Sequence, residues 1–189
     1  MQNPFLIGEK VYLRPIEEND IDNYVSWLND WDVRENLSMV LPFNKTRENE
    51  WIQGLYKDDK NIVLGIVLKG SDRLIGNIGL HGISMIHRHA TLGIFIGDKT
   101  CWSKGFGTEA VKLVLKYGFE QLNLHRITLT VFDFNARARK AYEKAGFILE
   151  GTYREHLFRN GKYCDVYFMG ILRSEWNKNS VSSENKGNK

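Results

Sequence analysis

The residues between Cys101 and Ala110, Cys-Trp-Ser-Lys-Gly-Phe-Gly-Thr-Glu-Ala, are typical of a loop that binds an anion. Gly105 and Gly107 carry no Cβ, so the backbone at these positions can turn sharply and approach a ligand closely. A helical pattern follows, and the first N–H groups of a helix have no partner within it. Such amides commonly hold phosphate. The spacing therefore predicts a phosphate-binding loop between a strand and a helix.

Two other interpretations of these glycines are open. Residues 105–110 also fit Gly-x-Gly-x-x-Ala, the start of a dinucleotide-binding fingerprint that requires an acidic residue about 20 positions later, at a strand end. Residues 126–131 read Arg-Ile-Thr-Leu-Thr-Val and contain no carboxylate, which argues against a Rossmann site. The glycines can also simply turn the chain, so a second motif is needed to decide.

That second motif is Asn135-Ala-Arg-Ala-Arg-Lys-Ala-Tyr-Glu-Lys-Ala-Gly-Phe147. Asn135 is a favourable N-cap and Gly146 a favourable helix end, which predicts a helix over residues 136–145. Asn135 and Tyr142 lie seven residues apart and share one stripe of that helix. Tyr142 is either an ordinary packing residue or an acid, because a phenol with an unperturbed pKa of about 10 can protonate a departing thiolate.

Together the two motifs resemble those of the GNAT superfamily of acyl-CoA-dependent N-acetyltransferases, and the resemblance covers about residues 8–175. Residues 102–107 are similar to the pyrophosphate loop Gln/Arg-x-x-Gly-x-Gly/Ala, with Trp first, as in ribosomal-protein N-terminal acetyltransferases. Residues 135–147 are similar to the family's Asn-x-x-Ala-x-x-x-Tyr-x-x-x-Gly-Phe. Residues 147–165 are also similar to spermidine N-acetyltransferases.

The resemblance implies acetyl-CoA as co-substrate, no metal, and Tyr142 as the acid that protonates the leaving thiolate. The residues that it places against the cofactor are Ile94, Phe95, Ile96, Trp102, Ser103, Lys104, Gly105, Phe106, Gly107, Thr108 and Asn135. The amides of residues 103–108 and the Thr108 hydroxyl would hold the pyrophosphate, and backbone groups of residues 94–96 would pair with the pantetheine arm. Thr108 and Asn135 can alternatively serve only as helix caps.

The general base is less clear from the sequence. Many relatives carry Glu near the position of Thr91, and a threonine hydroxyl cannot remove a proton at neutral pH. His81 and His89 are candidates because imidazole titrates near neutrality, although either can be a structural histidine. A chain of water molecules would also serve.

Alternating and helical patterns predict the elements that must position these residues. The strands are expected at residues 10–16, 61–68, 74–80, 87–96, 126–131, 147–158 and 163–172, and the helices at residues 21–29, 46–57, 108–122 and 136–145. Asp20 or Asn19 can cap the first helix, and Glu48 complements the dipole of the second. Asn160-Gly161 predicts a type I′ hairpin.

These elements and the resemblance together predict an α/β (α+β) GNAT fold. Its mixed sheet of about seven strands carries helices on both faces and splays open between the strands of Ile94 and Leu129, which a right-handed crossover makes parallel. Residues 1–176 are expected to form one acetyltransferase domain, and residues 177–189 a polar, disordered tail.

The composition favours a cytoplasmic protein. The net charge of +3 includes +2 from Arg173 onward, so the body is nearly neutral and gives no electrostatic case for nucleic acid or a membrane as partner. The two cysteines are too few for a disulfide framework. No apolar run approaches the roughly 18 residues of a membrane span. A homo-oligomer is left open.

The acceptor is expected to be a primary amine. In the family, the segment at residues 36–43 helps to wall the acceptor site, and here it reads Asn-Leu-Ser-Met-Val-Leu-Pro-Phe, without a carboxylate. A polyamine needs carboxylates to offset its desolvation, which favours an amino sugar, an amino acid derivative or a peptide N-terminus. Spermidine is the alternative acceptor, with Glu150, Glu155 and Asp165 as its carboxylates, and a non-catalytic CoA-binding regulatory domain is the alternative function.

Overall fold

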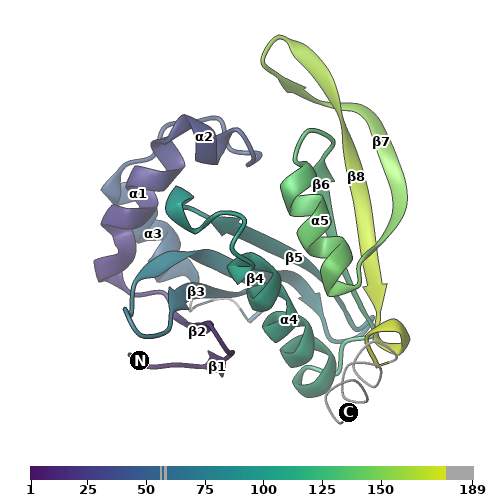
Figure 1. Cartoon of the computed structure of the whole chain (residues 1–189), viewed down its shortest axis with the longest axis horizontal. Helices are drawn as coiled ribbons and strands as arrows, with labels where there is room; N and C mark the ends of the chain where they lie inside the picture. Colours follow the sequence, from purple (N-terminus) through teal and green to yellow (C-terminus); the bar gives the residue numbers. More distant parts are fainter. Residues whose placement is uncertain (56, 58, 178–189) are drawn as a thin grey trace.

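The computed structural model describes residues 1–55, 57 and 59–177, so residues 178–189 of the predicted tail lie outside the described part. Within it, eight strands form one sheet in the order β1-β2-β3-β4-β5-β6-β8-β7 (Figure 1). The strands are β1 (Leu6–Ile7), β2 (Val11–Pro15), β3 (Ile62–Leu68), β4 (Leu74–Ser84), β5 (His89–Ile96), β6 (Arg126–Phe132), β7 (Ile148–Arg159) and β8 (Lys162–Leu172). The eighth strand beyond the predicted seven is β1, which is too short for an alternating pattern.

The helices cover both faces of this sheet, as predicted. They are α1 (Ile21–Asn29), α2 (Trp31–Arg34), α3 (Lys45–Leu55), α4 (Phe106–Lys116) and α5 (Ala136–Ala145), with short turns at Glu18–Asp20, Lys99–Cys101 and Tyr117–Gln121. Residues 173–177 are also helical, so the predicted tail is helical at its first residue, 177. One apolar core joins α4 and α5 to the sheet, and a second joins α1 and α3 to the opposite face. None of the helices in the described ranges is long and apolar enough to cross a membrane.

The sheet opens between β5 and β6. These strands are parallel, as predicted, but they pair only from His89 and Arg126 to Thr91 and Thr128. Beyond this point β5 continues to pair with β4, and β6 continues to pair with β8. The predicted splay is therefore confirmed, and from Leu92 onward β5 has no paired neighbour on the side of β6.

Side chains of β5 alternate between the two faces near this opening. A Cβ at Gly107 of α4 would lie 3.8 Å from side-chain atoms of both Ile94 and Ile96, so these residues face α4. Phe95 faces the opposite side, where its ring centroid lies 6.1 Å from that of Tyr24 in α1. One strand therefore contributes to both cores and to both sides of the opening.

The bounds of α5 and α1 agree with the sequence prediction, whereas the start of α4 and the role of Asp20 beside α1 differ from it. Asn135 caps α5 by accepting from Ala138 N at 3.1 Å, and Gly146, with φ of 103°, ends it. The α4 helix begins at Phe106, two residues before the predicted start at residue 108. Asp20 precedes α1 but does not cap it, because its carboxylate binds the buried Arg14 guanidinium at 2.7 and 2.8 Å. A buried charge needs a partner more than a helix end does.

Glu48 lies in the first turn of α3, as predicted, but it is only 2% exposed. Burial raises the pKa of its carboxyl from 4.5 to about 7, against the opposing effect of Arg47. A carboxyl whose pKa is raised by folding binds more protons in the folded state between pH 4.5 and 7, so stability falls as the pH rises through this window. At pH 8 the charged Glu48 costs the fold at most about 3 kcal/mol.

Replacing Glu48 by Gln should therefore raise the melting temperature at pH 8 and change it much less at pH 5. Thermal unfolding followed by circular dichroism at both pH values measures this. Glu50→Gln is the matched control, because Glu50 lies in the same helix and is exposed. A Glu48→Gln variant that is less stable than the wild type at pH 8 would contradict the burial argument.

Candidate active site

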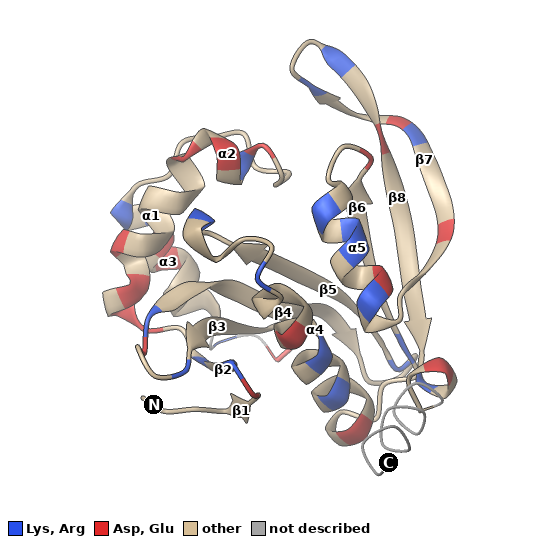
Figure 2. Cartoon of the chain, in the orientation of Figure 1, with Lys and Arg blue, Asp and Glu red and all other residues tan. Residues whose placement is uncertain are grey.

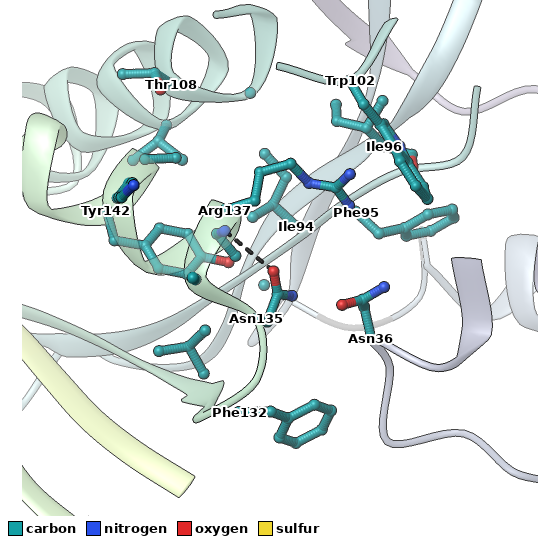
Figure 3. Close-up of a pocket in the computed structure, with 18 of the residues that line it drawn as sticks. Asn36, Ile94, Phe95, Ile96, Trp102, Thr108, Phe132, Asn135, Arg137 and Tyr142 are labelled. Atoms are coloured by element: carbon teal, nitrogen blue, oxygen red, sulfur yellow. Dashed lines mark hydrogen bonds between the residues drawn. The ribbon is translucent and has the colours of Figure 1, made fainter. Parts of the chain in front are cut away.

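A pocket of about 690 Å³ occupies the opening between β5 and β6 (Figure 3). It reaches both faces of the sheet, since Ile94 and Val111 line it on the α4 side and Phe95 and Asn36 on the other. The predicted site residues that it brings together are Ile94, Phe95, Ile96, Trp102, Ser103, Gly105, Gly107, Thr108, Asn135 and Tyr142. The side chains of Lys104 and Phe106 do not line it, and the predicted contacts of their amides stay a prediction.

The loop before α4 has the geometry of an anion site. Ser103 and Gly105 adopt left-handed backbone conformations, with φ of 61° and 87°. Gly105 is the N-cap residue and Glu109 N donates to Gly105 O at 3.1 Å, so the amides of residues 105–108 have no partner within the helix. Thr108 lies inside the first turn and lines the pocket, so the suggestion that it serves only as the cap was wrong.

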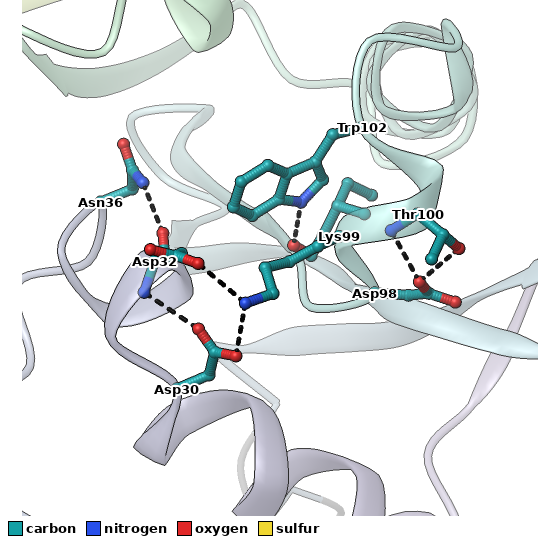
Figure 4. Close-up of polar contacts among 8 residues, drawn as sticks. Asp30, Asp32, Asn36, Asp98, Lys99, Thr100 and Trp102 are labelled. Carbon is teal, nitrogen blue, oxygen red and sulfur yellow. Dashed lines mark hydrogen bonds and ion pairs between the residues drawn. The ribbon is translucent and has the colours of Figure 1, made fainter.

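The free edge of β5 offers backbone groups to the same pocket. Gly97 N donates to Ile75 O at 2.8 Å, and backbone bonds of an antiparallel ladder recur every second residue. Phe95 therefore directs its backbone groups to β4, while those of Ile94 and Ile96 point into the opening. The carbonyl of Ile96 is already used, because it accepts from Trp102 Nε1 at 2.8 Å (Figure 4).

Trp102 is also the residue that departs from the usual loop motif, and it has two structural roles. Its indole N–H anchors the loop to β5, as described above. The guanidinium carbon of Arg137, from the start of α5, lies 3.7 Å from the centroid of its ring (Figure 3). This cation–π contact joins the two sides of the opening. No local motif marks Arg137, because its partner Trp102 lies 35 residues away in the sequence.

The charge of the pocket comes from α5. Arg137, Lys140 and Lys144 line it, and the lining residues in the described ranges include no aspartate or glutamate. Figure 2 shows lysine and arginine positions along α5. Burial lowers the pKa of Arg137, which nevertheless stays a cation because guanidinium ionises so far above neutrality. Together with the unpaired amides of α4, these cations make a site that fits the phosphates of a CoA molecule.

Tyr142 projects from α5 toward the pocket and is 8% exposed (Figure 3). Its ring packs edge-on against Phe147, with centroids 6.0 Å apart. Burial raises the pKa of its hydroxyl to about 12. The phenol therefore stays protonated through neutral and moderately alkaline pH, which suits a proton donor and excludes a resting base.

The wall opposite α5 is formed by α2 and the residues after it, including Asn36, Leu37 and Ser38. Lys99 Nζ lies 2.8 Å from carboxylate oxygens of both Asp30 and Asp32, and so ties this wall to the segment between β5 and the loop (Figure 4). On the far side, Arg159 of β7 donates to the Leu37 carbonyl at 2.6 Å. Lys99 and Arg159 were not recognised from the sequence, because neither belongs to a local motif.

The two histidines suggested as bases differ in position. Neither lines the pocket directly. His89 is exposed and stacks on His87 with ring centroids 6.1 Å apart, in the part of β5 that still pairs with β6. His81 lies on β4, half-buried, against the backbone of Gly93, and Gly93 lines the pocket. Asn135 was expected either to cap α5 or to lie against the cofactor. Its Oδ1 caps α5, and the residue also lines the pocket.

Residues 10–148 match the family described as an acetyltransferase (GNAT) domain. The chain belongs to the GNAT acetyltransferase family. The probable N-acetyltransferase YjcK of Bacillus subtilis is 34% identical over 181 residues, covering 90% of this chain and 98% of its own. The putative ribosomal N-acetyltransferase YdaF of the same organism is 32% identical over 142 residues, covering 75% of each chain.

Among solved structures, the spermidine N-acetyltransferase of Vibrio cholerae in complex with CoA and spermine superposes with a TM-score of 0.83. It is 29% identical, and the match covers 90% of this chain and 99% of that one. The predicted superfamily and fold are thus confirmed, and relatives from both of the branches that the sequence resembles are among the matches. This GNAT protein is an acetyl-CoA-dependent N-acetyltransferase, and the predicted function is confirmed at that level.

Proposed function

We propose that this cytoplasmic enzyme acetylates a primary amine by direct attack on acetyl-CoA in a ternary complex, through a catalytic domain of residues 1–176. The observation that carries the proposal is the pocket that reaches both faces of the opened sheet. Unpaired amides of α4 and the Tyr142 side chain serve it from one face, while Asn36 to Ser38 wall it from the other. A thioester and an amine can therefore approach one another from opposite sides.

The residues of the pocket then have the following roles. The amides of residues 103–108 and the Thr108 hydroxyl hold the pyrophosphate, while Arg137 and Lys140 add charge to its surroundings. The free backbone N–H of Ile94 polarises the thioester carbonyl, because a fixed donor is effective where charge develops in the transition state. Tyr142 gives its proton to the departing sulfur.

The acceptor that we favour carries little positive charge and is partly apolar. Two carboxylates at the α2 wall, Asp30 and Asp32, already hold Lys99. Glu150 is paired with Arg126, and Asp165 accepts from the Glu155 amide at 2.8 Å. An additional polyamine would therefore have to compete with these partners and with the cations of α5.

The segment that continues the α2 wall supports the same preference. Met39, Val40 and Leu41 are exposed beside Ser38, which lines the pocket. An amino sugar, an amino acid derivative or a peptide N-terminus can cover such a surface. A polyamine is the second candidate, because the Vibrio cholerae protein that superposes on this chain is named for spermidine.

A comparison of acceptors tests this proposal. Spermidine, aminoglycosides, amino sugars and short peptides are supplied at equal concentration with acetyl-CoA, and thiol release is followed. We expect the highest kcat/KM with an amino sugar, an amino acid derivative or a peptide. A kcat/KM for spermidine that is tenfold or more above the others would contradict the preference, and turnover of no amine would contradict the proposed activity.

A further inference from the structure

We propose that His81 is the general base of this acetyltransferase and takes the proton of the attacking amine through an opening that Gly93 leaves in β5. The inference rests on the proposed function, since it needs an amine bound beside the thioester. It gives a role to His81, which lies on β4 behind the wall of the pocket. It also explains why position 93 is a glycine.

The contact between the two residues defines the opening. A Cβ at Gly93 would lie 3.1 Å from His81 Nε2 and 3.3 Å from its Cδ2. The imidazole edge therefore covers the α-carbon of Gly93 where any other residue would place its side chain. Gly93 also lines the pocket, so the imidazole adjoins a residue of the pocket wall that has no side chain. A single water molecule, or the amine itself, can bridge so short a gap.

The face of the sheet is also the appropriate one. Ile94 faces α4, so Gly93 and the adjoining His81 face the opposite side, with Phe95 and the α2 wall. Tyr142 packs in the core that α4 and α5 share. His81 and Tyr142 thus reach the opening from opposite faces, as direct transfer requires of a base for the nucleophile and an acid for the leaving group.

Within the described part of the chain, the pocket wall itself offers no carboxylate or imidazole as a base. Its lining residues in the described ranges include no aspartate, glutamate or histidine. Burial lowers the pKa of His81, so the imidazole is neutral at pH 7 and able to accept a proton. The titratable side chains on the adjoining strand segments are Lys60, before β3, and His89 and Arg126 on β5 and β6. None of them contributes to this lowering.

The proton balance of the step is complete. The amine nitrogen attacks the carbonyl carbon of the thioester, so an N–C bond forms and the C–S bond breaks with its electron pair on sulfur. The nitrogen becomes acidic as the N–C bond forms, and its proton passes to His81. Tyr142 gives its hydroxyl proton to the sulfur. Exchange with water then returns His81 to its neutral form and Tyr142 to its protonated form.

Three variants test the assignment, each assayed with the best acceptor of the wild type. The wild type should lose kcat/KM as the pH falls below about 6.5, and His81→Gln should lower kcat/KM by about 10² or more and remove this fall. Gly93→Ala keeps the histidine but places a methyl group 3.1 Å from its Nε2, so the imidazole must shift away from the pocket wall and a comparable loss should follow. His89→Gln is the matched control and should retain both the rate and the pH profile, because His89 is exposed and lies outside the pocket.

Calorimetric titration with CoA separates a chemical role from a structural one. The affinity of His81→Gln for CoA should equal that of the wild type, and His81→Asn provides a second variant if the glutamine folds poorly. An unchanged rate and acidic limb in His81→Gln would overturn the inference, as would a parallel loss of CoA affinity in both His81 variants. If the wild type itself turned over no amine, the proposed function and not the base would be at fault.

Discussion

Replacement of Gly107 by Glu should abolish CoA binding while leaving the fold intact. Gly107 lies in the first turn of α4, beside the unpaired amides that we assign to the pyrophosphate. A carboxylate here brings a like charge to the phosphates, at a cost of several kcal/mol. At about 1.4 kcal/mol per decade, the dissociation constant should rise by roughly 10³ or more.

The fold should survive because position 107 itself tolerates a side chain. Its backbone φ is not in the left-handed region, and a Cβ would make only ordinary contacts, at 3.8 Å, with Ile94 and Ile96. Gly107→Ala is therefore the matched control for the charge: it should melt nearly as the wild type does and lose less CoA affinity than Gly107→Glu. Calorimetry with CoA and thermal unfolding measure the two effects. An unchanged affinity in Gly107→Glu would refute the phosphate-loop assignment.

Local signals account for the parts of the site that could be predicted from the sequence. The bounds of α5 follow from a capping residue and a terminal glycine, and the β7–β8 hairpin from Asn160 and Gly161, whose φ values of 52° and 78° suit a type I′ turn. The start of α4 was misplaced because its N-cap is Gly105, which has no side chain to bond the backbone and therefore gives a weaker signal than Ser, Thr, Asp or Asn.

Contacts between distant segments account for the parts that could not be predicted. Lys99 meets Asp30 and Asp32 across 67 residues or more, and Arg137 meets Trp102 across the opened sheet. His81 touches Gly93 only because the register of β4 and β5 places them side by side. The spacing of residues along one segment carries no information about contacts between distant segments. The sequence therefore could not distinguish His81 from His89 as the candidate base.

Substitution of Phe for Tyr142 should lower kcat by about 10² or more with little change in the KM for acetyl-CoA. The hydroxyl is a proton donor to the leaving sulfur, so its loss acts mainly on the transition state. The ring remains, and with it the packing against Phe147. Because burial raises the pKa of the hydroxyl to about 12, the wild-type rate should show no loss from ionisation of Tyr142 up to about pH 10.

The control for this variant is Tyr167→Phe, which removes a phenol from β8 outside the pocket lining and should leave kcat unchanged. Steady-state rates with saturating acceptor, measured from pH 6 to pH 10, distinguish the cases. If Tyr142→Phe retained kcat, the thiolate would leave unaided or be protonated by another group. If the KM for acetyl-CoA rose while kcat stayed unchanged, the Tyr142 hydroxyl would bind the cofactor and not protonate the sulfur. Loss of a donor that acts only on the leaving group would lower kcat and would not change ground-state binding alone.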